Sequence, residues 1–302
     1  MMNELTTSTN RMKVHIFNMQ HQHEAYTKYI RALDDRSCVL HVDFSENYSC
    51  GYSREIQSAH FGGSHQQATL HTGMIYYRNT HIPFTTVSNS MKHGPVAIWK
   101  HLEPIHDMIK THDPAIDTIH YFSDGPCTQY RQKQTFYLFS TACPFPNATW
   151  NFFESSHGKG AADGVGGAVK RRADDLLRHG TDLPTPLRLF EELKKTETDV
   201  ELIWVDEADI EQFRKSMKPV LDSLIPVPGT MKLHQIVKDG HGKIRSRLVS
   251  KIADHDESCC HQDLVFTFDV PKPPAVHPQP HPEPILERMA HLMGSVHQND
   301  GN

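Results

Sequence analysis

Hydrophobic and polar positions divide the first part of the chain into recognisable elements. Residues 1–36 are polar, with one helix predicted around 20–33. The segment 38–48, CVLHVDFSENY, is apolar and β-branched at first and then abruptly polar, which is typical of a buried strand that ends in a functional loop. The segments 67–79 and 82–90 alternate closely enough to predict two further strands joined by a short turn.

Helices and strands alternate in the segment that follows. Gly94 and Pro95 open VAIWKHLEPIHDMIKTH, whose apolar residues approximate one helical face. Pro104 lies inside this pattern, so that either a kinked helix or two shorter helices are expected. The pattern then predicts a strand over 116–125, a helix over 128–143, an aromatic strand over 149–156 and a helix from about 165 to 178.

The order of these elements, β-β-β-α-β-α-β-α, predicts a mixed sheet with helices on both faces, in an α/β domain. After Gly180 the expected elements are a helix over 185–196, a strand over 200–206, a helix over 207–217 and a basic, β-like stretch over 229–251. From Pro271 the proline-rich sequence PKPPAVHPQPHPEP predicts an extended, solvated tail. We therefore divide the chain into an N-terminal segment (1–36), a core (37–180), a C-terminal α+β extension (181–270) and a disordered tail (271–302).

Composition sets wide limits on the class of protein. The chain has 302 residues, enough for one large domain or two smaller ones, and 37% of them are hydrophobic, which is enough to build a core. No run approaches the roughly 20 apolar residues of a membrane helix, and the first residues lack the apolar stretch of a signal peptide. We therefore expect a soluble intracellular protein with no membrane partner. The net charge of −5 gives no overall case for nucleic-acid binding, which depends instead on the local distribution of charge.

The six cysteines are spaced neither as a disulfide framework nor as a zinc site with paired CxxC motifs, so that reduced, structural thiols are expected. Cys259, Cys260 and His261, with His255 nearby, form one local group of potential zinc ligands. Adjacent cysteines are poorly spaced for zinc, and this group therefore carries little weight.

Three aspartates fall at the ends of predicted elements. Asp43 lies at or near the end of the first core strand, Asp124 at the end of the fourth, and Asp163 just past the fifth, where a helix starts. Carboxylates that converge in an apolar setting repel each other and raise each other's pKa unless a cation lies between them. Mg²⁺ and Mn²⁺ take such oxygen ligands, and two ions about 3.5–4 Å apart can activate a nucleophile and stabilise the leaving oxygen of a phosphodiester.

Each aspartate also has a simpler interpretation. Ser123, Asp124 and Gly125 form a good turn by composition, and Asp163 followed by Gly164 offers a helix N-cap. For a single residue this structural role is favoured. Taken together, the acids lie on two strands that are expected to be adjacent and on the helix after a third strand, which favours a shared metal site.

The segments VDFSENY, HYFSDGPCTQYR and WNFFESSHGKGAADGVGGAVKR, in this order, resemble the catalytic core of eukaryotic cut-and-paste DNA transposases and of proteins derived from them. These DDE/DDD-type proteins belong to a retroviral-integrase-like group with an RNase H-like fold. The resemblance covers about residues 37–180 and extends more weakly to about residue 250 through IPVPGTMKLHQIV. Its motifs are fairly specific as a set and weak one by one.

The resemblance implies a role for each acid. Asp43 would match the first-strand acid and Asp124 the fourth-strand acid, while Asp163 lies where the third acid of the group is found. Many members carry glutamate at that third position, and Glu154 is therefore the alternative third acid. The cofactor that this implies is Mg²⁺ or Mn²⁺, bound by the three aspartates.

Residues 157–167, HGKGAADGVGG, hold five glycines. They do not form a Walker loop, because Gly158 and Lys159 are followed by Gly160 and not by serine or threonine. Periodic apolar segments flank the stretch tightly, which argues against a simple linker. We expect a strand-to-helix turn whose glycines let the backbone approach a nucleic-acid phosphate.

Basic residues near this turn and in the C-terminal part are candidates for contacts with the DNA backbone. The first group consists of His157, Lys159, Lys170, Arg171 and Arg172. The second group consists of Lys232, Lys243, Arg245 and Arg247, with Lys238 and Lys251 close by. The alternatives are a solvated helix face balanced by acids for the first group, a structural role for its lone histidine, and ordinary solubility for the second group.

These observations predict a divalent-metal-dependent transposase, or a protein derived from one, that cleaves DNA and transfers the strand. The alternatives are a nuclease of the same fold that stops at hydrolysis, and a domesticated DNA- or protein-binding module that has lost activity. The resemblance implies DNA as the partner, leaves a homo-oligomer open, and favours the nucleus over the cytoplasm. No sequence-specific DNA-binding domain is recognisable before the core, so that either the chain is a fragment or another subunit supplies targeting.

Overall fold

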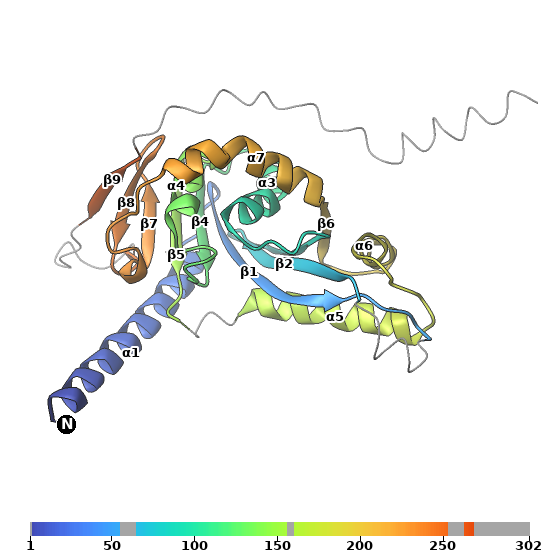
Figure 1. The fold of residues 1–302 in the computed structure, drawn as a ribbon. Helices are drawn as coiled ribbons and strands as arrows, with labels where there is room; N and C mark the ends of the chain where they lie inside the picture. The colour runs from blue at the N-terminus through green and yellow to red at the C-terminus, as the bar shows by residue number, and fades with distance from the viewer. Residues whose placement is uncertain (1, 55–64, 156–159, 253–262, 269–302) are drawn as a thin grey trace, which may run out of the picture. The chain divides into compact units, whose positions relative to one another are not determined.

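A computed structural model describes residues 2–54, 65–155, 160–252 and 263–268. The strands within these ranges are β1 (Ser37–Ser49), β2 (Gln67–Tyr76), β3 (His81–Ser88), β4 (Thr118–Ser123), β5 (Asn147–Phe152), β6 (Glu201–Val205), β7 (Gln235–Lys238), β8 (Lys243–Arg247) and β9 (Leu264–Thr267). Over the described ranges they form one nine-stranded sheet in the order β6-β3-β2-β1-β4-β5-β7-β8-β9 (Figure 1).

The direction of the strands makes this sheet mixed. β1, β2 and β3 form an antiparallel meander, and β4 and β5 then add to the other side of β1, parallel to it. The carboxyl ends of β4 and β5 therefore lie beside the middle of β1, near Val42, while β1 itself continues to Ser49. Side chains that follow β4 and β5 are brought close to the middle of β1, although they are far apart in the sequence.

Helices cover both faces of the sheet (Figure 1). They are α1 (Met2–Arg31), α3 (Pro95–His112), α4 (Lys133–Ala142), α5 (Ala161–Arg178), α6 (Pro186–Lys194) and α7 (Glu207–Ser223), and a 3-10 helix, η1, spans Thr230–Lys232. Along β1 the side chains alternate between the faces. Leu40 and Val42 enter the core formed with α3, α4 and α7, whereas Val39 packs with residues of α1 on the other face.

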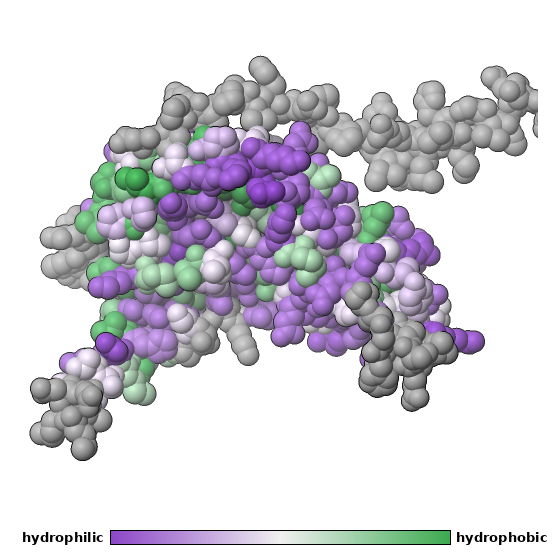
Figure 2. Space-filling model, viewed as in Figure 1, coloured by the Kyte–Doolittle hydropathy of each residue, from purple (hydrophilic) through white to green (hydrophobic). Residues whose placement is uncertain are grey.

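The expected mixed sheet with helices on both faces is confirmed, and several element boundaries differ from expectation. The first helix, α1, begins far earlier than residue 20, and α4 begins at Lys133, five residues later than expected, because residues 128–130 form a turn. α3 continues through Pro104 as one helix. The side of α7 turned outward is mostly hydrophilic (Figure 2), and its buried residues are Ile210, Met217 and Leu221.

The segment expected as a separate C-terminal extension contributes to the same sheet. β6 pairs with β3 at one edge, and β7, β8 and β9 extend the opposite edge beyond β5. β9 has no counterpart among the elements expected from the sequence. The proline-rich tail, 271–302, and the candidate zinc ligands from His255 to His261 lie outside the described residues.

No helix within the described ranges is long and apolar enough to cross a membrane.

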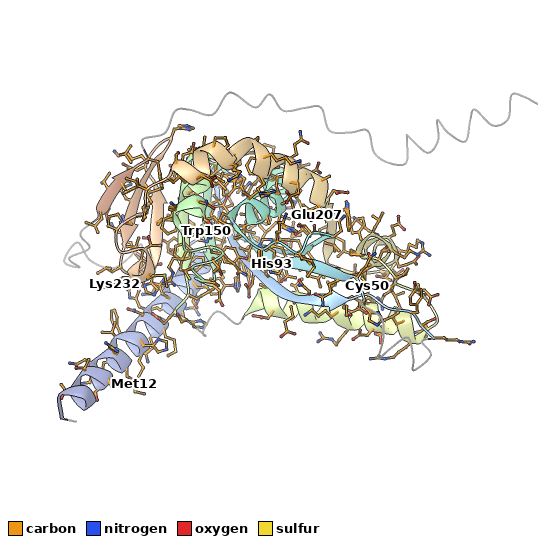
Figure 3. All side chains as sticks on the ribbon, in the orientation of Figure 1. Met12, Cys50, His93, Trp150, Glu207 and Lys232 are labelled. Carbon is orange, nitrogen blue, oxygen red and sulfur yellow. The ribbon has the colours of Figure 1, made fainter. Side chains whose placement is uncertain are left out.

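The helix α1 is attached to the body by a buried polar network. Gln22 is 1% exposed, and its Nε2 donates to Phe152 O at 2.9 Å and to Ser250 Oγ at 2.8 Å. The backbone N–H of Ser250 donates to Gln22 Oε1 at 2.9 Å. The amino-terminal half of α1 extends away from the sheet, with Met12 on it 65% exposed (Figure 3).

The helix α5 lies directly on β1 and β2 at Gly166. A Cβ atom at this position would lie 2.7 Å from Ser45 Oγ, 3.0 Å from Ser45 Cβ and 3.4 Å from Thr72 Cγ2. Glycine therefore allows the helix to approach the sheet more closely than alanine would. At Gly164, on the same helix, an added Cβ would meet no described atom within 4 Å.

We expect Gly166→Ala to be less stable than Gly164→Ala by about 1–3 kcal/mol, because only the first change forces atoms into an occupied contact. Alanine has the same higher helix propensity than glycine at both positions. The difference between the two variants in free energy of unfolding therefore reports on the contact with Ser45. Urea unfolding followed by circular dichroism measures it. Equal midpoints for the two variants would show that α5 does not rest on β1 at this glycine.

Candidate functional site

The register of the central strands places Asp43 and Asp124 side by side. Val42 on β1 pairs with Ser123, the last residue of β4, and the same register continued by one residue joins the two aspartates. Val42 belongs to the core on the α3 side of the sheet, and Asp43 therefore projects toward the opposite face. Both aspartates are partly buried.

Burial and the charges of neighbouring carboxylates change the acidity of these two groups. Burial, followed by the charges of Asp124 and Asp163, raises the pKa of Asp43 to about 7. Burial and the charge of Asp163 also raise the pKa of Asp124, and Arg131 partly opposes this. The structure thus brings the three sequence-predicted aspartates near enough to repel one another.

Asp163 is the third residue of α5 and is exposed. Its Oδ2 accepts a hydrogen bond from the backbone N–H of Gly160, the N-cap residue, at 2.9 Å. Asp163 is therefore not the N-cap that the sequence offered as the simpler interpretation, since Gly160 takes that position; it stabilises the helix start from the third helical position, as the acid of a capping box does. The charge of Asp163 nevertheless acts on both other aspartates, so that one side chain holds the start of the helix and also belongs to the acidic group.

A threonine of β2 connects the start of α5 to β1. Thr72 pairs with Asp43 across the antiparallel ladder. Its Oγ1 donates to Ala162 O at 2.9 Å and lies 3.3 Å from Asp43 O. Together with the close approach of Gly166 to Ser45, this contact fixes the first turn of α5 beside the strand that carries Asp43.

The carboxylate oxygens of Asp43, Asp124 and Asp163 suit a hard cation, although they are not arranged as a complete coordination shell. Asp124 Oδ1 is buried and has no hydrogen-bond partner among the described residues. Such an orphaned acceptor is costly unless a ligand satisfies it. In the described part of the chain, however, no three histidine, cysteine or acidic side chains are already gathered around one metal position. The donor chemistry therefore fits Mg²⁺ or Mn²⁺, while the side chains would still have to converge on the ion.

Glu154, the alternative third acid, belongs to a different set of contacts. Its Oε2 lies 3.0 Å from His234 Nε2, and its Oε1 lies 3.3 Å from His15 Nδ1. Burial would raise its pKa, but hydrogen bonds from Asn18 and Ser155 and the neighbouring His234 lower it overall. Asp163, and not Glu154, is the third carboxylate that raises the pKa of both Asp43 and Asp124.

Three residues near the acids were not predicted from the sequence. His41, two residues before Asp43 on β1, is buried, and its Nε2 has no partner within the described residues. Burial lowers its pKa to about 4, and the charge of Asp163 partly opposes this. Tyr130 is fully buried with its hydroxyl 3.0 Å from His71 Nε2, and Arg131 is 3% exposed. Both lie in the turn before α4, where a helix was expected, and they close the segment HYFSDGPCTQYR on which the resemblance rests.

The basic residues of α5 remain available in part. Lys170 and Arg171 make no hydrogen bond or ion pair with another residue that the structure describes, whereas Arg172 Nη2 donates to Glu197 O at 3.0 Å. His157 and Lys159 lie outside the described residues. Lys170 follows Asp163 by seven residues and therefore lies on the same side of the helix.

The second basic group is largely neutralised by carboxylates. Lys243 Nζ and Arg245 Nε lie 2.8 Å and 2.9 Å from the two oxygens of Asp239. Arg247 makes two contacts with Asp263, at 2.5 Å and 2.9 Å. These ion pairs weaken the case for binding phosphate at β8.

Lys232 is a separate case within the second basic group. It lies in η1 and is exposed (Figure 3). It therefore remains a candidate for a DNA contact.

A family model described as "Domain of unknown function (DUF8701)" matches residues 22–250, which include the three aspartates and most of the nine-stranded sheet. Comparison with curated proteins and with solved structures gave no match.

We expect Asp43→Asn to raise the stability of the metal-free protein at pH 8 by about 1–4 kcal/mol, because it removes a carboxylate whose folded pKa lies above its ordinary value of 3.8. Below the ordinary pKa of 3.8, Asp43 is protonated in both the folded and the unfolded protein and costs no stability. As the pH rises from there toward about 7, the unfolded protein ionises Asp43 more readily than the folded protein does, so that the folded protein loses stability. The advantage of the variant should therefore disappear near pH 4.

Thermal unfolding of both proteins between pH 4 and pH 8 in chelator measures this difference. Asp222→Asn, on the exposed side of α7, serves as the control and should show no such trend. An advantage of Asp43→Asn that stays constant with pH would contradict the proposed repulsion.

Proposed function

The chain belongs to the DUF8701 family, and we propose that it is a divalent-metal-dependent enzyme that cleaves DNA strands and transfers them, as a transposase or a protein derived from one. The observation that carries the proposal is the register of β1 and β4, which places Asp43 beside Asp124; burial raises the pKa of both carboxyls, and the charge of Asp163 adds to both shifts. Such a group is unstable without a cation and well suited to one.

The order and direction of the strands support an RNase H-like core. An antiparallel meander, β1 to β3, is followed by β4 and β5, which add in parallel on the other side of β1. The positions of the acids support the proposal as well. Asp43 lies on the first strand, Asp124 directly after the fourth and Asp163 on the helix that follows the fifth.

Asp43, Asp124 and Asp163 would hold the metal. When bound, Mg²⁺ or Mn²⁺ supplies Lewis-acid activation of a water or hydroxyl nucleophile and stabilises the leaving oxygen of the phosphodiester. The sheet fixes Asp43 in the ladder with β2, and Gly160 holds Asp163 at the start of α5. The buried Oδ1 of Asp124 is an acceptor that still needs a partner.

The substrate that we propose is DNA, contacted through its backbone. Lys170 and Arg171 follow Asp163 along α5 and can neutralise phosphates of a strand whose scissile bond lies at the acids. DNA as the substrate would place the protein in the nucleus. A homo-oligomer remains part of the proposal, because strand transfer requires two DNA ends to be held together.

The central test is cleavage of plasmid DNA with Mg²⁺ or Mn²⁺, with and without chelator. We expect Asp124→Asn and Asp163→Asn to be folded and to lose activity by at least about 10²-fold, because each removes a metal-binding oxygen. Glu154→Gln should keep at least part of the activity. Circular dichroism checks the fold, and Asp222→Asn is the matched surface control.

Three outcomes would change this assignment. Loss of activity in Glu154→Gln together with an active Asp163→Asn would transfer the third role to Glu154. Nicked products without strand transfer would indicate a nuclease. DNA binding without cleavage by the wild-type protein under any of these conditions would indicate a binding module that has lost activity.

The basic residues give an independent prediction about DNA binding. We expect Lys170→Gln and Arg171→Gln each to reduce the dependence of log Kd on log salt by about 0.9 or less, because each removes one phosphate contact. Arg245→Gln, whose arginine is already paired with Asp239, should change the slope less. Fluorescence anisotropy at several salt concentrations measures the slopes, and the reverse order would assign the DNA contact to β8.

A further inference from the structure

Arg131 joins three segments at the edge of the sheet where the acids lie. It stands in the turn between β4 and α4 and is 3% exposed. Its Nη2 donates to Phe153 O, just past β5, and its Nη1 donates to Met231 O in η1, both at 3.1 Å. One guanidinium thus ties the turn that follows Asp124 to the end of β5 and to η1.

The backbone of Gly125 makes room for this guanidinium. A Cβ atom at Gly125 would overlap the Nη2, Nε and Cζ atoms of Arg131. On another side, the Cζ atom of Arg131 lies 5.4 Å from the centre of the Phe152 ring. The residue directly after Asp124 therefore contacts the arginine side chain closely, and the two cannot move independently.

The charge of Arg131 is influenced by two carboxylates. Burial lowers its pKa, while Glu154 and then Asp124 oppose this, so that both acids are close enough to act on it. Its Nε is buried and makes no hydrogen bond with any described residue. A buried cation that donates only to backbone carbonyls loses its hydration without gaining a direct ion pair, so that it is a poor means of stabilising the fold.

We infer that Arg131 is a positioning residue for the acidic group: its guanidinium, seated against Gly125 and held by the carbonyls of Phe153 and Met231, sets where the Asp124 carboxylate stands. The inference rests on the proposed function, in which Asp124 is a metal ligand. Lysine does not reproduce this arrangement, because it lacks the two separate nitrogens, fixed in one plane, with which Arg131 reaches Met231 O and Phe153 O.

The experiment measures position and metal binding separately. The variants are Arg131→Lys, Arg131→Met and Gly125→Ala, and the control is Arg214→Met, which removes an exposed arginine of α7 that is paired with Glu211. Hydrogen–deuterium exchange in metal-free buffer reports on residues 124–130, with β2 as the internal reference. Titration with Mn²⁺, followed by thermal shift, reports on metal affinity.

We expect all three test variants to exchange faster over 124–130 than the wild type, with β2 unchanged, and to need about 10–100-fold more Mn²⁺ for half of the thermal shift. Arg214→Met should match the wild type in both measurements. Gly125→Ala keeps the arginine and its charge, so that it tests the seating of the guanidinium even where Arg131→Met fails to fold.

Unchanged exchange over 124–130 in Arg131→Lys and Gly125→Ala would overturn the inference. So would an Mn²⁺ midpoint equal to that of the wild type in variants that are only less stable, since a purely structural arginine would give that result. A wild-type protein with no Mn²⁺-dependent shift or cleavage would refute the proposed function. In that case faster exchange limited to 124–130 would still support the positional part of the inference.

Discussion

The partial burial of neighbouring carboxylates is the constraint on which the arrangement around the candidate site depends. Asp43 lies on β1 and Asp124 directly follows the adjacent β4; burial raises the pKa of both, and repulsion from Asp163 raises both further. A protein can tolerate this only if the surrounding structure holds the acids in place. The rigid ladder between β1, β2 and β4 does so, and it leaves one acceptor, Asp124 Oδ1, without a partner among the described residues.

The third acid reaches this group through helix–sheet packing. Gly166 lets α5 rest on Ser45, and Thr72 bonds to the first turn of that helix. Asp163 is thereby carried on an element whose position the sheet determines, while its own hydrogen bond to Gly160 fixes the start of the helix. Close packing and hydrogen bonding thus hold together charges that would otherwise separate.

The sequence alone predicted the mixed α/β sheet, because runs such as CVLHVDFSENY show their strand character locally. It also predicted that Asp124 follows a strand and that Asp163 lies at the start of a helix, whereas Asp43, expected at the end of its strand, lies in the middle of β1, which continues to Ser49. It could not predict the turn that holds Arg131, because residues 128–133 have the composition of a helix, whereas backbone bonds to Pro126 O and tertiary contacts of Arg131 with Phe153 and Met231 hold them in a turn. The ion pairs of Arg247 with Asp263 were missed for the same reason, since they depend on the pairing of β8 with β9.

The attachment of α1 through Gln22 limits the positions that this helix can occupy. A purely apolar contact would tolerate small shifts of the helix along its axis. The side-chain amide of Gln22, in contrast, bonds to Phe152 O and Ser250 in only one register. A shift by one turn would leave several buried donors and acceptors unsatisfied. The hydrogen bonds of Gln22 therefore fix the register of α1 on the sheet. Because Tyr26 on the same helix contacts His41, two residues before Asp43, the register of α1 also determines which side chain covers this part of β1.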